Sequence, residues 1–436
     1  MEVPIFFLYN IALRLISPFL FIFLFIRLKR RGIGLGSLEE RFGYIPDLPE
    51  AGEEKRLWIH AVSVGEVGVA AALLPELKER HQNLRIVIST VTETGREAAS
   101  RLAGVEKIIY LPFDFTSAVR RVFSRLRPSA LAVVETELWP NLIREANRRN
   151  LPVAVVNGRL SKKSFTRYSY LRTLFYPLLN SINGVAARNE IDSVRFKALG
   201  ASRVAVTGNI KFDMHPPRPP GDIFTERKKY ALEGADPVIV AGSTHPGEEA
   251  KIGRCFKELA MQYADLGLLV APRHLERLGE VEADLRRAGL APARWSQILH
   301  SKEEPSIRRK VVILDVMGQL ADAYACATVA FIGGSLIPHG GQNPIEAAVW
   351  GIPLVFGPHM ENFEDVADGL VKSGGAARVE REEDLLRVSV QWFSDPAARR
   401  RAGEMALSVA RSHRGAVVRC VDFLEEVLWN AGGKEK

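Results

Sequence analysis

The chain has 436 residues, of which 47% are hydrophobic and 25% are charged; this composition excludes a disordered protein and, at this length, predicts two domains. Its three scattered cysteines form no CxxC pair, so the sequence indicates neither a disulfide framework nor a zinc site. The net charge of +8 resides in residues 1–215, which hold 31 Lys and Arg against 20 Asp and Glu, and we expect this half to meet an anionic partner.

The basic residues are densest over 120–172, where twelve Lys and Arg accompany three acidic residues. Nucleic acid, an anionic membrane surface and a phosphorylated substrate would each suit such a surface. A solvated basic face without a partner is the alternative that the charge count leaves open.

The N-terminus favours a membrane. Residues 4–26 are apolar except for Asn10 and Arg14, and twenty-three apolar residues can cross about 30 Å of hydrocarbon. The segment lacks a basic start, and the cluster Lys29-Arg30-Arg31 follows it in place of a cleavage site, so we expect an uncleaved anchor over residues 1–31. The basic cluster places the remaining chain on the cytoplasmic side. The anchor could span the bilayer or lie in its interface.

Residues 32–213 alternate short apolar segments with helical patterns whose apolar residues recur at a spacing near 3.6. The apolar segments are rich in β-branched residues and apolar on both faces, which is typical of βαβ units with a parallel sheet. The candidate strands are 57–61, 85–89, 107–111, 130–134, 152–156, 184–187 and 203–207.

Four prolines between Pro216 and Pro220 predict a stiff linker over residues 214–222, because proline fixes φ and prevents regular structure. The alternation resumes over residues 223–436, with candidate strands at 237–241, 267–271, 311–314, 328–332 and 353–356. We therefore predict an α/β fold of two doubly wound, Rossmann-like domains, with ligands in the interdomain cleft outside the carboxyl ends of the strands.

The segment HAVSVGE, residues 60–66, places one carboxylate, Glu66, where the helix after the first strand should begin. A helix N-terminus favours the ionised carboxylate, which would keep a general base unprotonated at neutral pH. The spacing from Ser63 to Glu66 also fits a capping box, and the local pattern alone favours that structural role.

Charged residues also follow other strands. Glu135 and Glu137, in VVETELWPN, end a strand that should be buried, where carboxylates are costly unless they are paired or functional. They strengthen the catalytic interpretation of Glu66, with fold-supporting hydrogen bonds as the alternative. Lys211, in GNIKFD, stands just before the linker, and we expect it to face the cleft and hold a phosphate or carboxylate. An exposed lysine without a partner is the alternative there.

The second half carries glycine-rich segments after its strands, and these glycines let the backbone approach a ligand closely. Asn343 and Pro344 begin a helix whose free N–H groups suit an anion, and Glu346 could accept hydrogen bonds from ribose hydroxyls. Arg273, at a strand end, could bind a phosphate. The sequence holds no P-loop, no DxD motif and no His/Asp cluster with metal-ligand spacing, so it implies neither a divalent metal nor another cofactor. These features suggest group transfer from a nucleotide-activated donor to an anionic acceptor at a membrane.

At these residues the chain resembles the 3-deoxy-D-manno-octulosonic acid (Kdo) transferases of Gram-negative bacteria. The resemblance runs from the anchor to near residue 420 and is carried, in order, by HAVSVGE, ETELWPNLI, NGRLS, TGNIKFD, STHPGEE, PRHLER, GGSL…GGQNPIEAA and GPHMENF. It implies the GT-B glycosyltransferase fold, with an acceptor-binding domain over 32–213 and a donor-binding domain over 223–436. The C-terminal helix is expected to pack back on the N-terminal domain.

The resemblance also implies an inverting, metal-independent transfer of Kdo from CMP-Kdo. The implied acceptor is the primary hydroxyl of the distal glucosamine in the tetraacyl disaccharide bisphosphate precursor of lipid A. This places the protein in lipopolysaccharide inner-core synthesis at the cytoplasmic face of the bacterial inner membrane. The membrane is therefore an expected partner, and nucleic acid is not.

Matched residue by residue, Glu66 is the base that takes the proton from the acceptor hydroxyl, while Glu135 and Lys211 stabilise the transition state. The CMP-binding segments of the family match Pro272, Arg273, Met317, Gly318, Gln319, Asn343, Pro344, Ile345 and Glu346. Gln319 is a departure, because members of the family often carry Glu there, although either side chain can bond the base or the ribose.

We further expect a basic group in the N-terminal domain to hold the two acceptor phosphates, namely Arg159, Lys162, Lys163, Arg167 and Arg172. Negative charge develops on the departing CMP, where Arg273 and Lys211 could stabilise it. Two other functions stay open from the residues alone. One is a GT-B transferase that uses a nucleotide-diphosphate sugar, which would need a stronger diphosphate site than Arg273 supplies. The other is a non-catalytic, membrane-bound nucleotide- or RNA-binding protein that uses residues 120–172.

Overall fold

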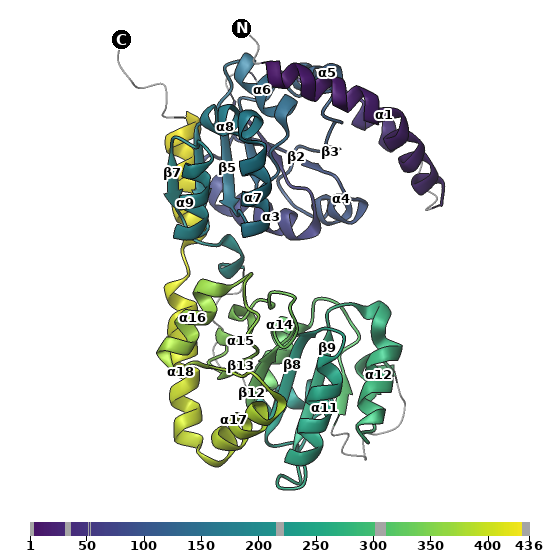
Figure 1. Ribbon diagram of the computed structural model, residues 1–436, viewed down its shortest axis with the longest axis vertical. Coiled ribbons are helices and arrows are strands. Elements are labelled where there is room, and N and C mark those ends of the chain that lie inside the picture. The colour runs from purple at the N-terminus through teal and green to yellow at the C-terminus, as the bar shows by residue number, and fades with distance from the viewer. Residues whose placement is uncertain are drawn as a thin grey trace. The chain divides into compact units, whose positions relative to one another are not determined.

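The computed structural model describes residues 4–30, 36–50, 52, 54–214, 222–300 and 311–429. The chain divides into two compact units: unit 1 comprises Met1–Met214 and Arg414–Lys436, and unit 2 comprises His215–His413. Each unit is built around a seven-stranded sheet whose strand pairs are parallel, with helices covering the sheet (Figure 1). The proline-rich stretch predicted as a linker lies outside the described residues from position 215 to position 221.

The sheet of unit 1 has the strand order β3-β2-β1-β4-β5-β6-β7. Its strands are β1 (Arg56–His60), β2 (Arg85–Thr90), β3 (Lys107–Tyr110), β4 (Ala130–Val134), β5 (Val153–Gly158), β6 (Gly184–Ala187) and β7 (Val204–Val206). The helical elements are α1 (Pro4–Arg30), α2 (Gly36–Arg41), α3 (Val64–Arg80), α4 (Glu93–Ser100), α5 (Thr116–Leu126), α6 (Pro140–Arg148), α7 (Lys162–Tyr170), α8 (Arg172–Asn180), α9 (Glu190–Ala198), η1 (Ile210–Phe212), α19 (Ala416–Leu424) and η4 (Glu425–Trp429).

The central strands of unit 1 are buried on both faces, which explains their unbroken apolar sequences. Trp58 and Leu131 point into one core with helices α5, α6 and α8. Ile59 and Ala132 point into the opposite core with α3 and α19. The sheet therefore has a distinct helical layer on each face.

Helix α19 belongs to unit 1 although it lies about 200 residues further along the chain than the other elements of that unit. It packs against α3, β5 and β6, and it is yellow in Figure 1. Asp213 caps its start, because its carboxylate accepts hydrogen bonds from the backbone N–H groups of Gly415 at 2.8 Å and Val417 at 2.7 Å. A carboxylate at a helix N-terminus satisfies free N–H groups and interacts favourably with the helix dipole.

The first half of α1 packs on unit 1. Phe6 is 5% exposed and joins the core beneath α5 and α6. The Tyr9 hydroxyl donates to Asp114 at 2.8 Å, and Asn10 exchanges hydrogen bonds with Asn141. This explains why a polar Asn interrupts the apolar N-terminal segment: its side chain faces protein. Within the ranges given above, no helix combines the length and apolar character needed to cross a membrane.

Unit 2 has the strand order β10-β11-β9-β8-β12-β13-β14. Its strands are β8 (Val238–Thr244), β9 (Gly267–Pro272), β10 (Ala293–Arg294), β11 (Val311–Ile313), β12 (Val329–Ile332), β13 (Leu354–Phe356) and β14 (Ala376–Arg378). Its helical elements are α10 (Ile223–Lys229), α11 (Glu248–Leu259), η2 (Leu275–Arg277), α12 (Leu278–Arg287), α13 (Trp295–His300), α14 (Leu320–Ala323), η3 (Tyr324–Cys326), α15 (Ile345–Ala348), α16 (Glu364–Ser373), α17 (Glu382–Ser394) and α18 (Pro396–Ser412).

All twelve strands expected from the sequence are confirmed, with ends that differ by a few residues. The sequence analysis missed β10 and β14, the short strands at the two edges of the second sheet. Each has two or three residues, includes an arginine and is only partly buried, so it lacks the apolar run that identified the others.

Removing the Asp213 carboxylate should loosen α19. We expect Asp213→Ala to speed amide hydrogen exchange in residues 416–424 by about 30-fold, because two charged hydrogen bonds, together worth about 2 kcal/mol, are lost. Exchange would be followed by mass spectrometry. Asp47→Ala is the matched control, because Asp47 is 72% exposed and lies 4.0 Å from Arg125. Equal protection in both variants would contradict a capping role for Asp213.

Candidate active site

The strand order defines one crevice in each unit. In unit 1, β1 pairs with β2 on one side and with β4 on the other, so the chain leaves β1 and β4 toward opposite faces of the sheet. In unit 2, β8 lies in the same way between β9 and β12. Ligands of doubly wound sheets bind at this point, outside the carboxyl ends of the strands. The candidate residues follow these strands.

Glu66 lies in the first turn of α3, directly after β1, and is 9% exposed. Its carboxylate accepts a hydrogen bond from the backbone N–H of Val62 at 2.7 Å and from the Ser63 hydroxyl at 3.3 Å. The predicted capping box is not formed, because the Ser63 side chain accepts no hydrogen bond from the helix backbone. Glu66 thus stabilises the loop between β1 and α3 by hydrogen bonds, and its carboxylate lies at the crevice.

The expectation that the helix start would keep Glu66 ionised is wrong. Burial raises the pKa of Glu66 to about 7, the Val62 hydrogen bond partly opposes this, and the nearby charges of Glu135 and Glu137 raise it further. Near neutral pH the carboxylate is therefore divided between its two protonation states. A pKa close to the working pH suits a group that must first accept a proton and later release it.

Glu135 and Lys211 form an ion pair beside Glu66. The Lys211 ammonium lies 2.7 Å from the Glu135 carboxylate, and both side chains are partly buried. Glu135 follows β4 in the left-handed backbone region, at φ 58°, which turns its side chain out of the strand direction. A Cβ placed on Gly65 would lie 3.9 Å from the Lys211 ammonium, so this cation sits against the start of α3. The structure therefore brings together the three residues that the sequence predicted for catalysis.

Asn157 positions Lys211, and the sequence analysis missed it. This buried residue is the penultimate residue of β5, with φ 53°, and its side-chain oxygen accepts a hydrogen bond from the backbone N–H of Ile210 at 3.0 Å. Asn209 then accepts one from the N–H of Lys211 at 3.1 Å. The only signal in the sequence was the polar Asn-Gly pair that ends an apolar strand.

The predicted phosphate-binding residues fall into two groups. Arg159 follows β5 and is half-buried near the carboxylates: burial and Arg188 lower its pKa, and Glu135 opposes this. Lys162, Lys163 and Arg167 are exposed on α7, and Arg172 is exposed at the start of α8, where it stacks on the Tyr176 ring. Helix α7 lies close to the loop after β4 that carries Glu135 and Glu137, since the Tyr168 hydroxyl reaches the carbonyl of Thr136 at 3.5 Å.

The predicted CMP-binding segments all follow strands at the carboxyl edge of the second sheet. Pro272 ends β9, and the exposed Arg273 donates its backbone N–H to the carbonyl of Thr244 at 3.0 Å. Met317 and Gly318 are exposed after β11, and Gln319 begins α14. The remaining segment, Asn343, Pro344, Ile345 and Glu346, leads into α15 after β12.

The side chains of that last segment bond to one another. The Asn343 amide oxygen accepts from the N–H of Ile345 at 3.1 Å, and its amide nitrogen lies 3.4 Å from Glu346. A helix does begin after Asn343 and Pro344, as expected, but this helix, α15, has only four residues. The groups that this segment offers to a ligand are therefore mainly polar side chains rather than the N–H groups of a helix end.

Glu248, a residue the sequence analysis missed, joins two loops of unit 2. It is fully buried at the start of α11, and its carboxylate accepts hydrogen bonds of 2.7–3.0 Å from the N–H groups of His245, Gly334, Ser335 and Leu336. The loop after β8 and the loop after β12 are therefore held by one side chain. Its signal in the sequence was a pair of glutamates following the glycine of STHPGEE.

Three histidines gather near those loops: His245 follows β8, His274 follows β9 and His339 follows β12. The ring of His245 lies 3.9 Å from that of His339 and 5.9 Å from that of His274, measured between centroids. Burial, then the neighbouring histidines and Arg273, lower the pKa of His245 to about 4, so its ring is neutral at physiological pH. Arg273 thus supplies fixed positive charge beside a neutral, polar ring.

Two parallel-sheet units, each with loops at the carboxyl edge of its sheet, are the GT-B architecture. The chain is similar to a glycosyltransferase structure from Rickettsia africae, with a TM-score of 0.62, 11% identity and coverage of 87% of this chain and 100% of that one. It is also similar to the UDP complex of MnaA from S. aureus, with a TM-score of 0.54, 15% identity and coverage of 85% and 96%. At these identities the similarity concerns the fold alone.

The sequence comparisons identify the family. Residues 36–214 match the family model described as 3-deoxy-D-manno-octulosonic-acid transferase. The 3-deoxy-D-manno-octulosonic acid transferase of Bordetella pertussis is 34% identical over 96% of this chain and 99% of its own length. That of Haemophilus influenzae is 33% identical over 90% and 91%. The chain belongs to the Kdo transferase family.

Neutralising Glu66 should stabilise the protein at alkaline pH. The folded pKa of about 7 exceeds the ordinary value of 4.5, so the folded state loses stability as pH rises from about 4.5 to 7 and stays lowered above that. We expect Glu66→Gln to raise the free energy of unfolding at pH 8 by about 1–3 kcal/mol and to lose this advantage below about pH 4.5. Denaturant unfolding at both pH values measures it, with the exposed Glu79→Gln on α3 as control. A pH-independent effect would contradict the raised pKa.

Proposed function

We propose that the protein catalyses an inverting transfer of Kdo from CMP-Kdo to the primary hydroxyl of the distal glucosamine of the tetraacyl lipid A precursor. The observation that carries the proposal is the cluster of Glu66, Glu135 and Lys211 in a chain of the Kdo transferase family. The B. pertussis and H. influenzae relatives, which match nearly the whole chain, are named 3-deoxy-D-manno-octulosonic acid transferases.

Glu66 is the proposed base. Direct displacement at the sugar carbon inverts that centre and needs one group to take the proton of the attacking hydroxyl. Glu66 meets this need, because its pKa of about 7 leaves much of it ionised at neutral pH while making it more basic than an exposed carboxylate. The second carboxylate, Glu135, is held in an ion pair by Lys211, so its proposed role is to fix that cation.

Unit 2 is the proposed binding site for CMP-Kdo. The departing CMP gains negative charge at its phosphate, and Kdo carries a carboxylate beside the reacting carbon. Arg273, placed beside the neutral ring of His245, is the proposed cation for one of these groups. The polar Asn343–Glu346 segment, whose side chains already bond to each other, is the proposed contact for the nucleoside.

Unit 1 is the proposed acceptor-binding unit, at the cytoplasmic face of the inner membrane. Helix α1 supports this placement, because Phe7, Leu8, Leu15, Ile16 and Phe19 are exposed along it. Exposed apolar side chains on one helix are typical of a segment that contacts lipid. The exposed cations of α7 are the proposed ligands of the acceptor phosphates.

The direct test is incubation of the purified full-length protein with CMP-Kdo and the tetraacyl precursor, followed by mass spectrometry of the lipid. The proposal predicts a product that is heavier by one or more Kdo residues. A lipid of unchanged mass, with CMP-Kdo intact, would overturn the proposed donor and acceptor.

Replacing Glu66 should remove most of the activity and its pH dependence. We expect Glu66→Gln to lower kcat by at least ~10²-fold, the usual scale for loss of a general base. In the unaltered protein kcat should fall about tenfold per pH unit below about pH 7, because only ionised Glu66 accepts the proton. Glu79→Gln is the control. If Glu66→Gln retains kcat, Glu66 is not the base.

The cations of α7 should act on acceptor binding. We expect the triple variant Lys162→Gln, Lys163→Gln and Arg167→Gln to raise the KM for the lipid precursor by about tenfold or more and to leave the KM for CMP-Kdo within about twofold, because exposed charges each contribute modestly. Initial rates with each substrate varied in turn measure both constants. An unchanged acceptor KM would remove these residues from the site.

A further inference from the structure

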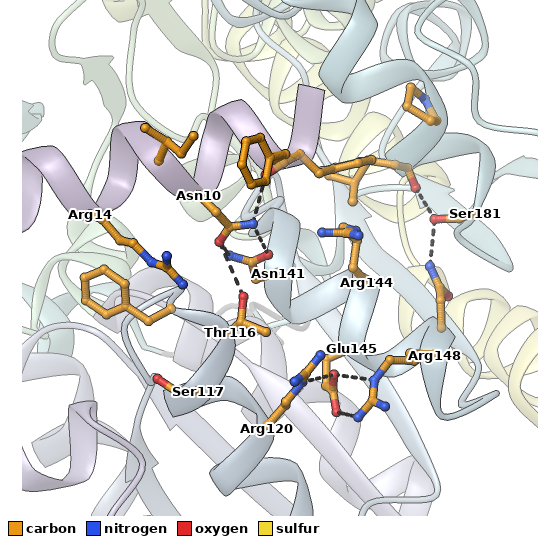
Figure 2. Close-up of a pocket in the computed structure, with 17 residues that line it drawn as sticks. Asn10, Arg14, Thr116, Ser117, Arg120, Asn141, Arg144, Glu145, Arg148 and Ser181 are labelled. Carbon is orange, nitrogen blue, oxygen red and sulfur yellow. Dashed lines mark hydrogen bonds and ion pairs between the residues drawn. The ribbon is translucent and has the colours of Figure 1, made fainter. Parts of the chain in front are cut away.

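A large pocket lies beneath α1 in unit 1, away from the catalytic residues. Its volume is about 870 Å³, and helices α1, α5, α6 and α8 contribute its walls (Figure 2). Glu66, Glu135 and Lys211 do not line it, and neither do the proposed phosphate ligands of α7. None of the functional assignments above uses this pocket.

Four arginines, Arg14, Arg120, Arg144 and Arg148, line the pocket. The side chain of Arg14 is exposed, and those of Arg120 and Arg148 are more than half exposed, at 53% and 56%. Figure 2 shows Arg14 and Arg144 on the α1 side and Arg120 and Arg148 across the pocket. Exposed guanidinium groups that converge from several helices are a geometry suited to phosphate, which accepts paired N–H donors.

The one carboxylate in the pocket wall, Glu145, does not cancel this charge. It is 4% exposed and lies 2.7 Å from Arg148 and 2.8 Å from Arg149, whereas Arg120 is 3.4 Å away. Burial raises its pKa, but the hydrogen bonds from Arg148 and Arg149 outweigh this and lower it to about 2. With four arginines and one carboxylate in its lining, the pocket keeps an excess of positive charge.

The pocket also meets the apolar surface of α1. Phe7 and Ile11, both exposed, line it, and further exposed apolar side chains continue along the same helix to Phe19. Hydrogen bonds from Asn10 to Asn141 and from Thr116 to Asn10 fix α1 over the pocket. A cationic cavity that opens beside an exposed apolar helix matches a molecule with an anionic head and apolar chains.

We propose that this pocket binds the phosphate headgroup of an anionic membrane phospholipid, whose acyl chains lie along the exposed apolar side chains of α1. The site would hold unit 1 on the bilayer by a headgroup that is not a substrate. The inference rests on the membrane placement proposed above, and it is independent of which sugar is transferred.

The test measures lipid binding to purified full-length protein in a non-ionic detergent. Short-chain phosphatidylglycerol is titrated, and bound lipid is counted by native mass spectrometry, with short-chain phosphatidylcholine and inorganic phosphate in separate arms. We expect one phosphatidylglycerol per chain, at least about tenfold tighter binding than phosphatidylcholine, and weak binding of inorganic phosphate.

The informative variant is Arg14→Gln with Arg120→Gln. It removes two pocket cations while Arg148 and Arg149 still hold Glu145, so unit 1 should fold normally. We expect its affinity for phosphatidylglycerol to fall about 25-fold, since each basic side chain near an anionic lipid contributes about a factor of five. The control, Arg101→Gln with Lys197→Gln, removes the same charge at exposed positions outside the pocket and should change affinity less than about threefold.

Three outcomes would overturn the proposal. Equal losses in both double variants would mean that net charge, not the pocket, attracts the lipid. Equal binding of the two phospholipids would exclude headgroup recognition, and tight binding of inorganic phosphate would assign the pocket to a free anion. Transfer of Kdo to the precursor in detergent is measured on the same variants. If the unaltered protein transfers no Kdo, the proposed function is contradicted, but the conclusion about lipid binding is unaffected.

Discussion

The position of the first strand in each sheet is the constraint on which the functional sites depend. In unit 1, β1 lies between β2 and β4, and the helices that follow β1 and β4 pack on opposite faces of the sheet. The two connections therefore separate at the carboxyl edge and leave backbone and side-chain groups accessible there. Glu66 follows β1 and Glu135 follows β4, so the topology itself brings the two carboxylates together. Unit 2 repeats this arrangement with β8, and there Glu248 holds the separating loops.

The position of Glu66 after β1 determines the pKa of its carboxyl group. The helix start and the Val62 N–H both favour the ionised carboxylate, whereas burial and two neighbouring carboxylates favour the neutral one. The second group of effects is larger, and the result is a group that is half-ionised near neutrality. A freely exposed glutamate would be ionised but would be a weaker base. Burial thus costs stability and provides the basicity that the proposed proton transfer from a hydroxyl would require.

The sequence was sufficient for much of this architecture because the central strands are buried on both faces. Burial of that kind favours unbroken apolar runs, often with β-branched residues, and those runs identified all twelve principal strands. Charged residues such as Glu66 and Lys211 were conspicuous because they interrupt or follow such runs. What the sequence could not supply were partners distant in the chain. Asn157 holds a backbone group 53 residues away, and Glu248 holds groups 86 to 88 residues away. The same limit explains the error about Glu66, since the helix start is local whereas burial depends on the whole fold.

The basic residues of the run 120–172 are adjacent in the sequence but occupy different surfaces of the folded unit 1. In the sequence it is one concentration of positive charge, which suggests one anionic partner. In unit 1 its members separate: Arg120, Arg144 and Arg148 line the pocket beneath α1, whereas helix α7 with its cations lies near the loop after β4. Several of the first group are also partly engaged with Glu145. If the proposed function holds, the protein works on a phosphorylated lipid within a membrane of other anionic lipids, and it must distinguish its substrate from these surroundings. Two separate cationic surfaces, one beside the proposed base and one beside the apolar helix, would meet that need.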